Sequence, residues 1–273
     1  MKKGIKWNVI YIFIFVSCLF IAWFFLASLE QRSLYYPAAR VEGTPADVGI
    51  AYENVFIRTS DGVTLHGWFV PVDPARGTVL FFHGNAGNIS HRLHRVDFFR
   101  RLGVNLLLVD YRGYGRSTGK PGERGLYRDA EAAYQYLCSK IEIPADDIIF
   151  YGKSLGGAVA AELSLRHEPR ALVLESTFTS TAAMGREVYP FLPVGLIVRQ
   201  NFDTLAKVGR IRAPKLILHG RQDEIIPFRH GVTLHDAAVP PKKFIPFAGG
   251  HNDERYVVSD EYLHVLAEFL NRE

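Results

Sequence analysis

A serine flanked by glycines lies between an apolar run and a run of small residues. The pentapeptide 152–156 reads Gly-Lys-Ser-Leu-Gly, after the apolar residues 148–151. This pattern is typical of a strand, a sharp turn and a helix, with the hydroxyl of Ser154 held clear of the chain. Because strand and helix then approach closely, we expect that only glycine fits at 152 and 156. A buried glycine-rich turn without chemistry has the same pattern, so Ser154 needs partners elsewhere in the chain.

An acid and a histidine follow two later apolar runs. Asp223 comes shortly after residues 215–220, and His251 lies in a glycine-rich segment after residues 243–247. A nucleophilic serine needs a histidine to take its proton and an acid to orient the imidazole ring. The chain order serine, acid, histidine differs from that of chymotrypsin and of subtilisin. The spacing therefore predicts a catalytic triad of Ser154, Asp223 and His251.

Other acids fit the pattern less well than Asp223. Glu175, which follows another apolar run, is the alternative acid, and Asp203 is a weaker candidate. Asp253 follows His251 too closely to orient its imidazole ring. The prediction therefore keeps Asp223, with Glu175 as the alternative.

The glycine-rich segment 83–88, His-Gly-Asn-Ala-Gly-Asn, follows the apolar run 78–82. It has neither the lysine of a P-loop nor the G-x-G-x-x-G pattern, so nucleotide binding is not favoured. In a serine hydrolase, the loop after the third strand and the residue after the nucleophile each offer a backbone N–H to the oxyanion. These positions predict Asn85 and Leu155 as the donors. His83 is interpreted as a structural loop histidine.

The sequence predicts no metal and no cofactor. His91 and His94 lie on one face of an expected helix, but no carboxylate or third ligand is placed beside them. The glycines after Asp110 are spaced one residue too far apart for a dinucleotide site. Asn88 begins an Asn-Ile-Ser sequon, which matters only in a eukaryotic secretory compartment.

Apolar runs of strand length alternate with amphipathic segments, which predicts an α/β fold with a mostly parallel central sheet flanked by helices. The expected strands are 54–58, 65–70, 78–82, 104–109, 148–151, 171–174, 215–220 and 243–247, and the main expected helices are 91–102, 123–140 and 260–270. Residues 176–214 are too long for a simple crossover and predict a small cap. Within them, the apolar residues 188–198 are either packed on the core or form an acyl-chain wall or a membrane-facing lip.

Residues 7–29 carry no charge and are long enough to cross a bilayer. A cleaved signal peptide would have a shorter apolar region and an A-x-A site, so we favour a retained single-pass anchor. Three lysines precede this stretch, which places the N-terminus in the cytoplasm and the catalytic domain on the periplasmic, lumenal or extracellular side. We therefore expect an anchor over 1–30, a juxtamembrane linker over 31–52 and the main domain over 53–273.

The net charge of +4 is concentrated at the N-terminus. Residues 1–32 contain four basic residues and one acid, which gives +3 of that charge. The rest of the chain is nearly neutral and has no basic face, so nucleic acid is not an expected partner.

From Asn54 to its C-terminus the chain resembles membrane-anchored α/β-hydrolase-domain serine hydrolases. The matching motifs are residues 83–88, Asp-Tyr-Arg-Gly-Tyr-Gly at 110–115, the pentapeptide 152–156, residues 220–223 and Gly-Gly-His at 249–251. The resemblance implies the α/β-hydrolase fold and the triad, and relatives of this kind include lysophospholipid and monoacylglycerol lipases and thioesterases. Lys153 departs from the aromatic residue, histidine or arginine that is commoner at this position.

These features predict a serine hydrolase that cleaves carboxylic ester or thioester bonds through an acyl-enzyme. The anchor and the apolar cap favour a lipid-borne acyl substrate. The alternatives are an esterase of small soluble esters, a peptidase, and a membrane-anchored adaptor that keeps the fold without catalysis.

Overall fold

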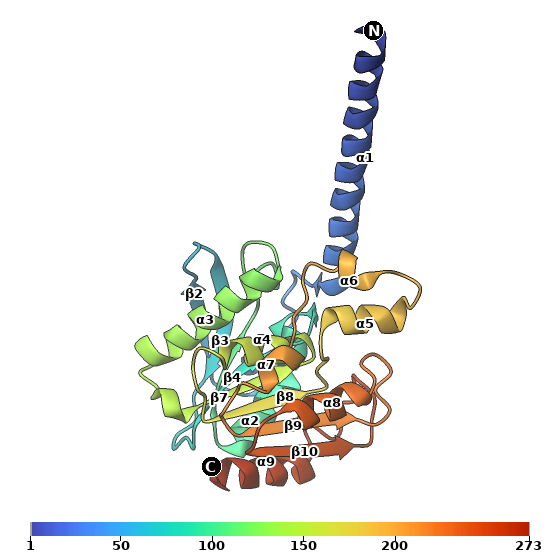
Figure 1. Ribbon diagram of the computed structural model, residues 1–273. Coiled ribbons are helices and arrows are strands. Elements are labelled where there is room, and N and C mark those ends of the chain that lie inside the picture. Colours follow the sequence, from blue (N-terminus) through green and yellow to red (C-terminus); the bar gives the residue numbers. More distant parts are fainter. Residues whose placement is uncertain (1, 273) are drawn as a thin grey trace.

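An eight-stranded, mostly parallel sheet forms the centre of the computed structural model, which describes residues 2–272 (Figure 1). Its strand order is β10-β9-β8-β7-β4-β6-β3-β2. β3 runs antiparallel to β2 and β6, and the other neighbours are parallel. The strands are β2 (Glu53–Arg58), β3 (Thr64–Val70), β4 (Thr78–Phe82), β6 (Asn105–Val109), β7 (Ile148–Lys153), β8 (Ala171–Glu175), β9 (Lys215–Gly220) and β10 (Lys242–Phe247).

Every apolar run predicted to be a strand forms one, with ends that differ by no more than two residues. The sheet order and the flanking helices are those of the α/β-hydrolase fold, so the predicted fold class is confirmed. The carboxyl ends of the parallel strands β4, β7, β9 and β10 lie at one edge of the sheet. The segments that carry the candidate site residues follow these ends.

Helices cover both faces of the sheet. α3 (Glu123–Ser139), α4 (Leu155–Leu163), α7 (Leu205–Val208) and α8 (Arg229–Ala237) pack on one face, and α2 (Leu93–Leu102) and α9 (Asp260–Arg272) on the other. Alternate residues of β4 separate the two cores: Leu80 and Phe82 face the first layer, and Val79 and Phe81 face the second. Because both faces are covered, all five residues of β4 are buried, which explains its continuous apolar sequence. Short 3-10 helices cover Ile89–Arg92 and Ala145–Asp147.

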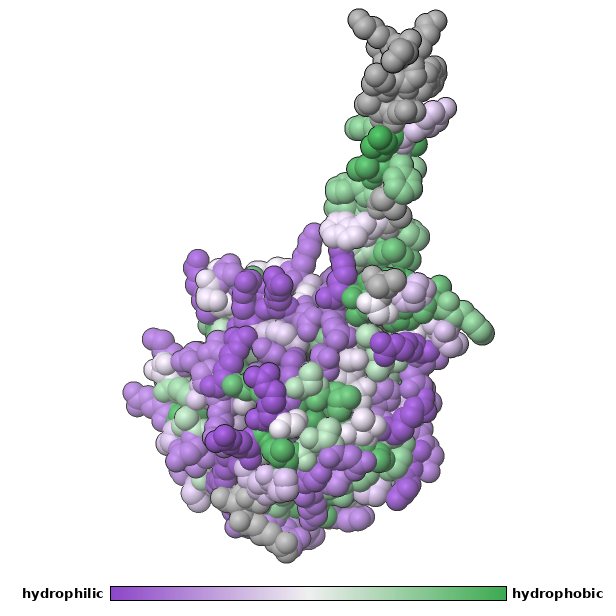
Figure 2. All heavy atoms as spheres, viewed as in Figure 1, coloured by the Kyte–Doolittle hydropathy of each residue, from purple (hydrophilic) through white to green (hydrophobic). Residues whose placement is uncertain are grey.

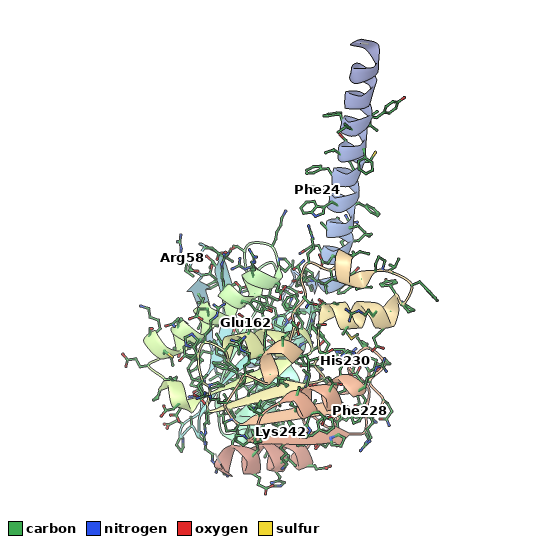
Figure 3. All side chains as sticks on the ribbon, in the orientation of Figure 1. Phe24, Arg58, Glu162, Phe228, His230 and Lys242 are labelled. Atoms are coloured by element: carbon green, nitrogen blue, oxygen red, sulfur yellow. The ribbon has the colours of Figure 1, made fainter. Side chains whose placement is uncertain are left out.

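A single long helix, α1 (Lys2–Leu34), stands away from this domain (Figure 1). Its segment Tyr11–Leu34 has a mean hydropathy of 2.6 and is long and apolar enough to cross a membrane. Phe24 is one of its exposed aromatic side chains (Figure 3). The helix is compatible with a single-pass anchor, and an N-terminal signal sequence would meet the same test of length and hydropathy. The expected boundary at residue 30 falls inside α1.

The segment expected to be a linker, residues 31–52, is hydrogen-bonded to the domain. β1 (Tyr36–Pro37) pairs in parallel with β5 (Ala86–Gly87), and a 3-10 helix covers Pro45–Val48. The side chain of Asn88 donates to two carbonyls of this segment, at 3.0 and 2.6 Å. Asn88 is fully buried by these contacts, so its amide is not accessible for glycosylation in the folded protein.

The expected cap, residues 176–214, contains α5 (Thr181–Val188), α6 (Val194–Ile197) and α7. Ser180 caps α5 by accepting a hydrogen bond from the backbone of Ala183. At the base of the cap, His230 of α8 (Figure 3) accepts a hydrogen bond of 3.1 Å from the backbone N–H of Thr179. Burial lowers the pKa of His230 to about 4, so its ring is neutral when it makes this contact.

Candidate functional site

Ser154 lies in the sharp turn between β7 and α4. Its backbone has φ 54° and ψ −118°, a conformation that a residue with a side chain rarely adopts. A Cβ at Gly152 would overlap the carbonyl of Gly156, and one at Gly156 would overlap the carbonyl of Phe82. The close approach of strand and helix that was expected from the sequence is therefore present, and it leaves no room for side chains at these two positions.

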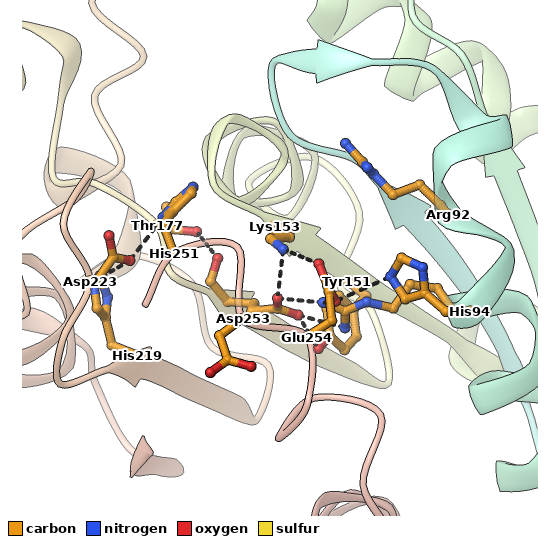
Figure 4. Close-up of polar contacts among 12 residues, drawn as sticks. Arg92, His94, Tyr151, Lys153, Thr177, His219, Asp223, His251, Asp253 and Glu254 are labelled. Carbon is orange, nitrogen blue, oxygen red and sulfur yellow. Dashed lines mark hydrogen bonds and ion pairs between the residues drawn. The ribbon is translucent and has the colours of Figure 1, made fainter. Parts of the chain in front are cut away.

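Asp223 and His251 are in direct contact. His251 Nδ1 lies 2.8 Å from Asp223 Oδ2 (Figure 4). The other carboxylate oxygen, Oδ1, accepts hydrogen bonds from the backbone N–H groups of Ile225 and Ile226, at 3.0 and 2.7 Å. The turn after β9 thus fixes the carboxylate, and the carboxylate fixes the imidazole ring on the loop after β10.

Asp223 is ionised in this environment. Burial opposes its charge, but hydrogen bonds from His219 and His251 outweigh burial and hold the pKa of Asp223 well below its usual range. An anionic Asp223 favours the tautomer of His251 that carries its proton on Nδ1. The other nitrogen, Nε2, is then left without a proton and can act as a base.

Ser154 and His251 are not joined by a hydrogen bond. Within residues 2–272, neither the hydroxyl of Ser154 nor Nε2 of His251 has a hydrogen-bond partner. Their side chains are only slightly exposed, Ser154 at 7% and His251 at 8%. The contact between Asp223 and His251 of the predicted triad is therefore formed, and the hydrogen bond between His251 and Ser154 is not. This is common before a substrate binds.

Two backbone N–H groups near Ser154 are free to donate hydrogen bonds to an oxyanion. The loop after β4 passes beside the serine, because a Cβ at Gly84 would lie 3.6 Å from the Cβ of Ser154. Neither the N–H of Asn85 nor that of Leu155 donates a hydrogen bond within the described part of the chain. Leu155 is the first residue of α4, where N–H groups have no partner inside the helix and the helix dipole favours negative charge.

The loop that carries Asn85 is held from three directions. The carbonyl of Asn85 accepts hydrogen bonds from the backbone of Tyr36, at 3.0 Å, and from the hydroxyl of Tyr114, at 2.8 Å. Its side-chain amide donates to the carbonyl of Leu34, at 3.1 Å. The side chain of Asn85 is therefore used to fix the loop to the end of α1, which leaves only its backbone N–H for an oxyanion.

Glu175, the alternative acid, is committed to other partners. It binds the guanidinium of Arg95 through two hydrogen bonds, of 2.9 and 2.6 Å, and accepts a hydrogen bond of 2.6 Å from the hydroxyl of Tyr151. Arg95 and Glu175 are almost completely buried. The carboxylate of Glu175 is thus bound by Arg95 and Tyr151, and among the described residues the acid that contacts the imidazole of His251 is Asp223.

A second acid, Glu254, joins the histidine loop to the serine turn. Its carboxylate forms an ion pair with Lys153, directly before Ser154, and another of 2.5 Å with Arg95 (Figure 4). Burial raises the pKa of Glu254, but hydrogen bonding to His94 and the charges of Arg95 and Lys153 lower it well below its usual range. Since Glu254 lies three residues after His251, the ion pair of Glu254 with Lys153 joins the loop after β10 to the sharp turn at Ser154, here called the elbow.

The remaining acids and histidines singled out in the sequence have structural contacts. Asp203 accepts a hydrogen bond from the backbone of Ala206 at the start of α7. His83 is fully buried, its Nδ1 lies 2.6 Å from the carbonyl of Gly84, and burial lowers its pKa to about 4. Among the described residues, no group of three or more histidine, cysteine or acidic side chains is placed to hold a metal ion.

The sequence reasoning missed His219. Its Nε2 lies 3.3 Å from Asp223 Oδ2 and 2.8 Å from the carbonyl of Ile226, and it is fully buried. The signal available was a histidine at the end of β9, four residues before the predicted acid. The cluster of Arg95, Lys153, Glu175 and Glu254 gave no comparable signal, because its members come from four separate segments of the chain.

Comparison with known proteins gives matches over most of the chain. A family model described as serine aminopeptidase, S33, matches residues 73–202. The alpha/beta hydrolase domain-containing protein WAV2 of Arabidopsis thaliana is 36% identical over 274 residues, which cover 90% of this chain and 89% of the relative. Protein bem46 of Schizosaccharomyces pombe is 37% identical over 262 residues, covering 88% of this chain and 85% of the relative.

The fold also matches solved structures. An esterase of Pyrococcus furiosus has a TM-score of 0.72 with 23% sequence identity, covering 88% of this chain and 97% of that one. At this identity, the likeness shows the shared fold.

Proposed function

Since this chain belongs to the α/β-hydrolase family, we propose that it is a serine hydrolase that cleaves carboxylic ester or thioester bonds. The observation that carries the proposal is the 2.8 Å contact between His251 and an ionised Asp223, in a protein whose Ser154 is held at a strained elbow. The family match and the esterase fold neighbour support a hydrolase.

In the proposed mechanism, Nε2 of His251 removes the proton of Ser154 as the serine oxygen attacks the carbonyl carbon of the substrate. Asp223 keeps the ring in the required tautomer and stabilises the imidazolium that forms. The oxyanion of the tetrahedral intermediate accepts hydrogen bonds from the N–H groups of Asn85 and Leu155. His251 then gives its proton to the departing alcohol or thiol.

Water completes the reaction. His251 removes a proton from a water molecule, which attacks the acyl-enzyme, and the same two N–H groups hold the second oxyanion. Collapse of this intermediate releases the carboxylic acid and returns the proton to Ser154. Each step uses side chains and backbone groups that this chain provides.

We further propose that the acyl group belongs to a lipid or to an acylated molecule at a membrane. The support is the apolar helix α1, together with large exposed apolar side chains on the cap. In this proposal, α1 is a retained anchor, the N-terminus is cytoplasmic and the domain lies on the far side of the membrane. Protease added to sealed spheroplast preparations should digest the domain, and a protected domain would contradict this orientation.

Amide hydrolysis is the second candidate, and it is favoured by the description of the matching family as serine aminopeptidase. The same triad would serve both reactions, so the leaving group is what separates them. An ester or thioester releases a better leaving group than an amide, and it needs no recognition of a free amino group.

A substrate panel tests these proposals. The full chain should hydrolyse nitrophenyl esters and an acyl thioester, with rates that increase from short to long acyl chains, and should leave an aminoacyl anilide intact. The control is Ser154→Ala, which should lose activity towards every substrate. Cleavage of the anilide alone would favour the peptidase. Activity confined to the shortest esters would argue against a lipid substrate.

A further inference from the structure

We propose that residues 188–192, here called the cap tip, insert into the membrane leaflet that surrounds the C-terminal end of α1. This second contact would hold the active site close to the bilayer surface. The proposal rests on the proposed function, in which α1 is a membrane anchor. It adds a second membrane contact, made by the catalytic domain itself. Four observations support the proposal. They are the exposure of the cap tip, the attachment of the cap to α1, the position of the cap tip relative to the active site, and the size and charge of the apolar surface.

The cap tip exposes large apolar side chains. Phe191 is 98% exposed, and more than half of the surface of Val188, Tyr189 and Leu192 is also accessible. Apolar residues gather on the cap beside the lower end of α1 (Figure 2). Contiguous apolar surface of this kind marks a contact with a partner or a membrane.

The cap is bonded to the anchor at the point where the apolar stretch ends. Glu30, the first acid after residues 7–29, accepts hydrogen bonds from the backbone N–H groups of Arg199 and Gln200, at 2.7 and 2.8 Å. The guanidinium of Arg199 lies 4.5 Å from the ring centre of Trp23. Because the hydrocarbon region must end close to Glu30, these contacts place the cap at the surface of the bilayer.

The cap tip and the active site lie on the same edge of the sheet. The cap leaves the carboxyl end of β8, which pairs with β7, the strand that leads to Ser154. On the same edge, Leu34 at the end of α1 accepts the hydrogen bond from Asn85. A membrane that surrounds α1 and contacts the cap tip therefore lies beside the loop that carries an oxyanion donor.

The size and the charge of this surface fit a membrane better than a protein partner. A few apolar side chains on one loop bury much less area than a stable protein interface requires, but they suit shallow insertion beneath the headgroups. Arg186 lies two residues before the cap tip, where it can contact lipid phosphates, and the charge of Glu187 between them is paired with Arg229. The occupant that we infer is thus a phospholipid surface.

A fluorescent label on Phe191 tests the contact directly. Phe191→Cys, in a chain that also carries Cys18→Ser and Cys138→Ser, is labelled with an environment-sensitive dye and reconstituted in phosphatidylcholine vesicles. Lipids with a nitroxide on the acyl chain should quench the dye, and aqueous iodide should not. The matched control is Val239→Cys, an exposed apolar position between α8 and β10, at the amino edge of the parallel strands, where only iodide should quench.

Quenching of the Phe191 label by iodide alone, as at Val239, would overturn the proposal. Protection from both quenchers would also overturn it, because it would show the cap tip covered by protein. Neither result depends on enzymatic activity. The membrane contact can therefore be refuted while the proposed hydrolase function stands, and the contact can be observed even if the chain shows no hydrolase activity.

Activity provides a second readout. The double variant Phe191→Ser and Leu192→Ser should hydrolyse a long-chain ester embedded in vesicles about tenfold more slowly, since two apolar side chains no longer enter the lipid. Its hydrolysis of a short soluble ester should be unchanged, which controls for folding. An equal loss towards both substrates, or no loss towards the embedded one, would contradict the role of the cap tip.

Discussion

At the residue scale, the site depends on backbone positions as much as on reactive groups. Ser154 lies in a strained turn where α4 approaches β7 at Gly152 and β4 at Gly156 so closely that only glycine fits at these two positions. The sequence pattern predicted the glycine requirement correctly, because it follows from local geometry. The roles of Ser154, Asp223 and His251 remain predictions from chain order, now supported by the contact between Asp223 and His251 in the structure.

Substitution of a single elbow glycine should disable the enzyme. In Gly156→Ala, the new methyl group would overlap the carbonyl of Phe82, so the turn must open and Ser154 must move. We expect kcat/KM towards a soluble ester to fall by about 10²-fold or more. The matched control is Gly122→Ala, where the nearest atom to a Cβ is a side-chain oxygen at 3.7 Å and activity should be kept. Wild-type activity in Gly156→Ala would contradict this account of the elbow.

A buried histidine beside the site should make stability depend on pH. Burial lowers the pKa of His83 from 6.5 to about 4. Between these values the unfolded chain takes up a proton that the folded chain does not, so the free energy of unfolding should decrease as pH falls from 6.5 to 4. The contribution of His83 is up to about 3 kcal/mol.

Urea denaturation in detergent across this pH range measures the effect. In His83→Gln, the free energy of unfolding should depend less on pH than in the wild type. A pH dependence of the same sign should remain, because burial also lowers the pKa of His230. An unchanged slope in His83→Gln would show that His83 is protonated in the folded protein.

At the element scale, the strands were predictable and their connections were not. Strands covered on both faces are rich in apolar residues, so β4, β7 and β9 were visible as apolar runs in the sequence. The ion cluster of Arg95 and Glu254 was not predictable, because burial of a charge depends on partners that only the tertiary structure brings together. The same holds for the pairing of β1 with β5, which involves only two residues on each side.

The pair of Lys153 and Glu254 should position His251 relative to Ser154. Glu254→Gln removes the charge that binds the loop after β10 to the elbow, and we expect kcat to fall by about 10-fold to 10²-fold through misplacement of the imidazole. Lys153→Met should have a similar effect, and the double variant should be little worse than either single variant, because the two residues act as one unit.

The control for the variants of Lys153 and Glu254 is Asp253→Asn, one residue before Glu254. Asp253 pairs with the exposed side chain of Arg255, and the loss of an exposed pair should change kcat by no more than about twofold. If the losses of kcat in Lys153→Met and Glu254→Gln were strictly additive in the double variant, the ion pair would not be what positions His251. Thermal denaturation of each variant separates loss of positioning from loss of folding.

At the scale of the whole molecule, helix α1 and the α/β-hydrolase domain are joined by ordered structure. The sequence favoured a linker over residues 31–52, since this region has no clear period and contains several prolines and glycines. Such composition gives no indication of hydrogen bonds to distant loops. In the structure, the segment after α1 pairs with the loop that carries Asn85, and Glu30 binds the cap.

Two truncations test whether this segment belongs to the catalytic unit. A chain that begins at Glu30 keeps β1 and should hydrolyse a short soluble ester at a rate close to that of the full chain. A chain that begins at Val41 loses Leu34 and Tyr36, two of the three partners of Asn85, so the loop that carries Asn85 is held less firmly, and the rate should fall by about 10²-fold or more. Circular dichroism controls for folding, and equal activity of the two chains would contradict a positioning role for residues 34–38.

The central claim is that Ser154 is an activated nucleophile. A fluorophosphonate probe reacts with such a serine, and mass spectrometry of the labelled full-length chain identifies the modified residue. We predict a single adduct on Ser154, no labelling of Ser154→Ala, and much slower labelling of His251→Ala, which folds without the base. Labelling of Ser154→Ala at the wild-type rate, or no labelling of the wild-type chain, would contradict the account.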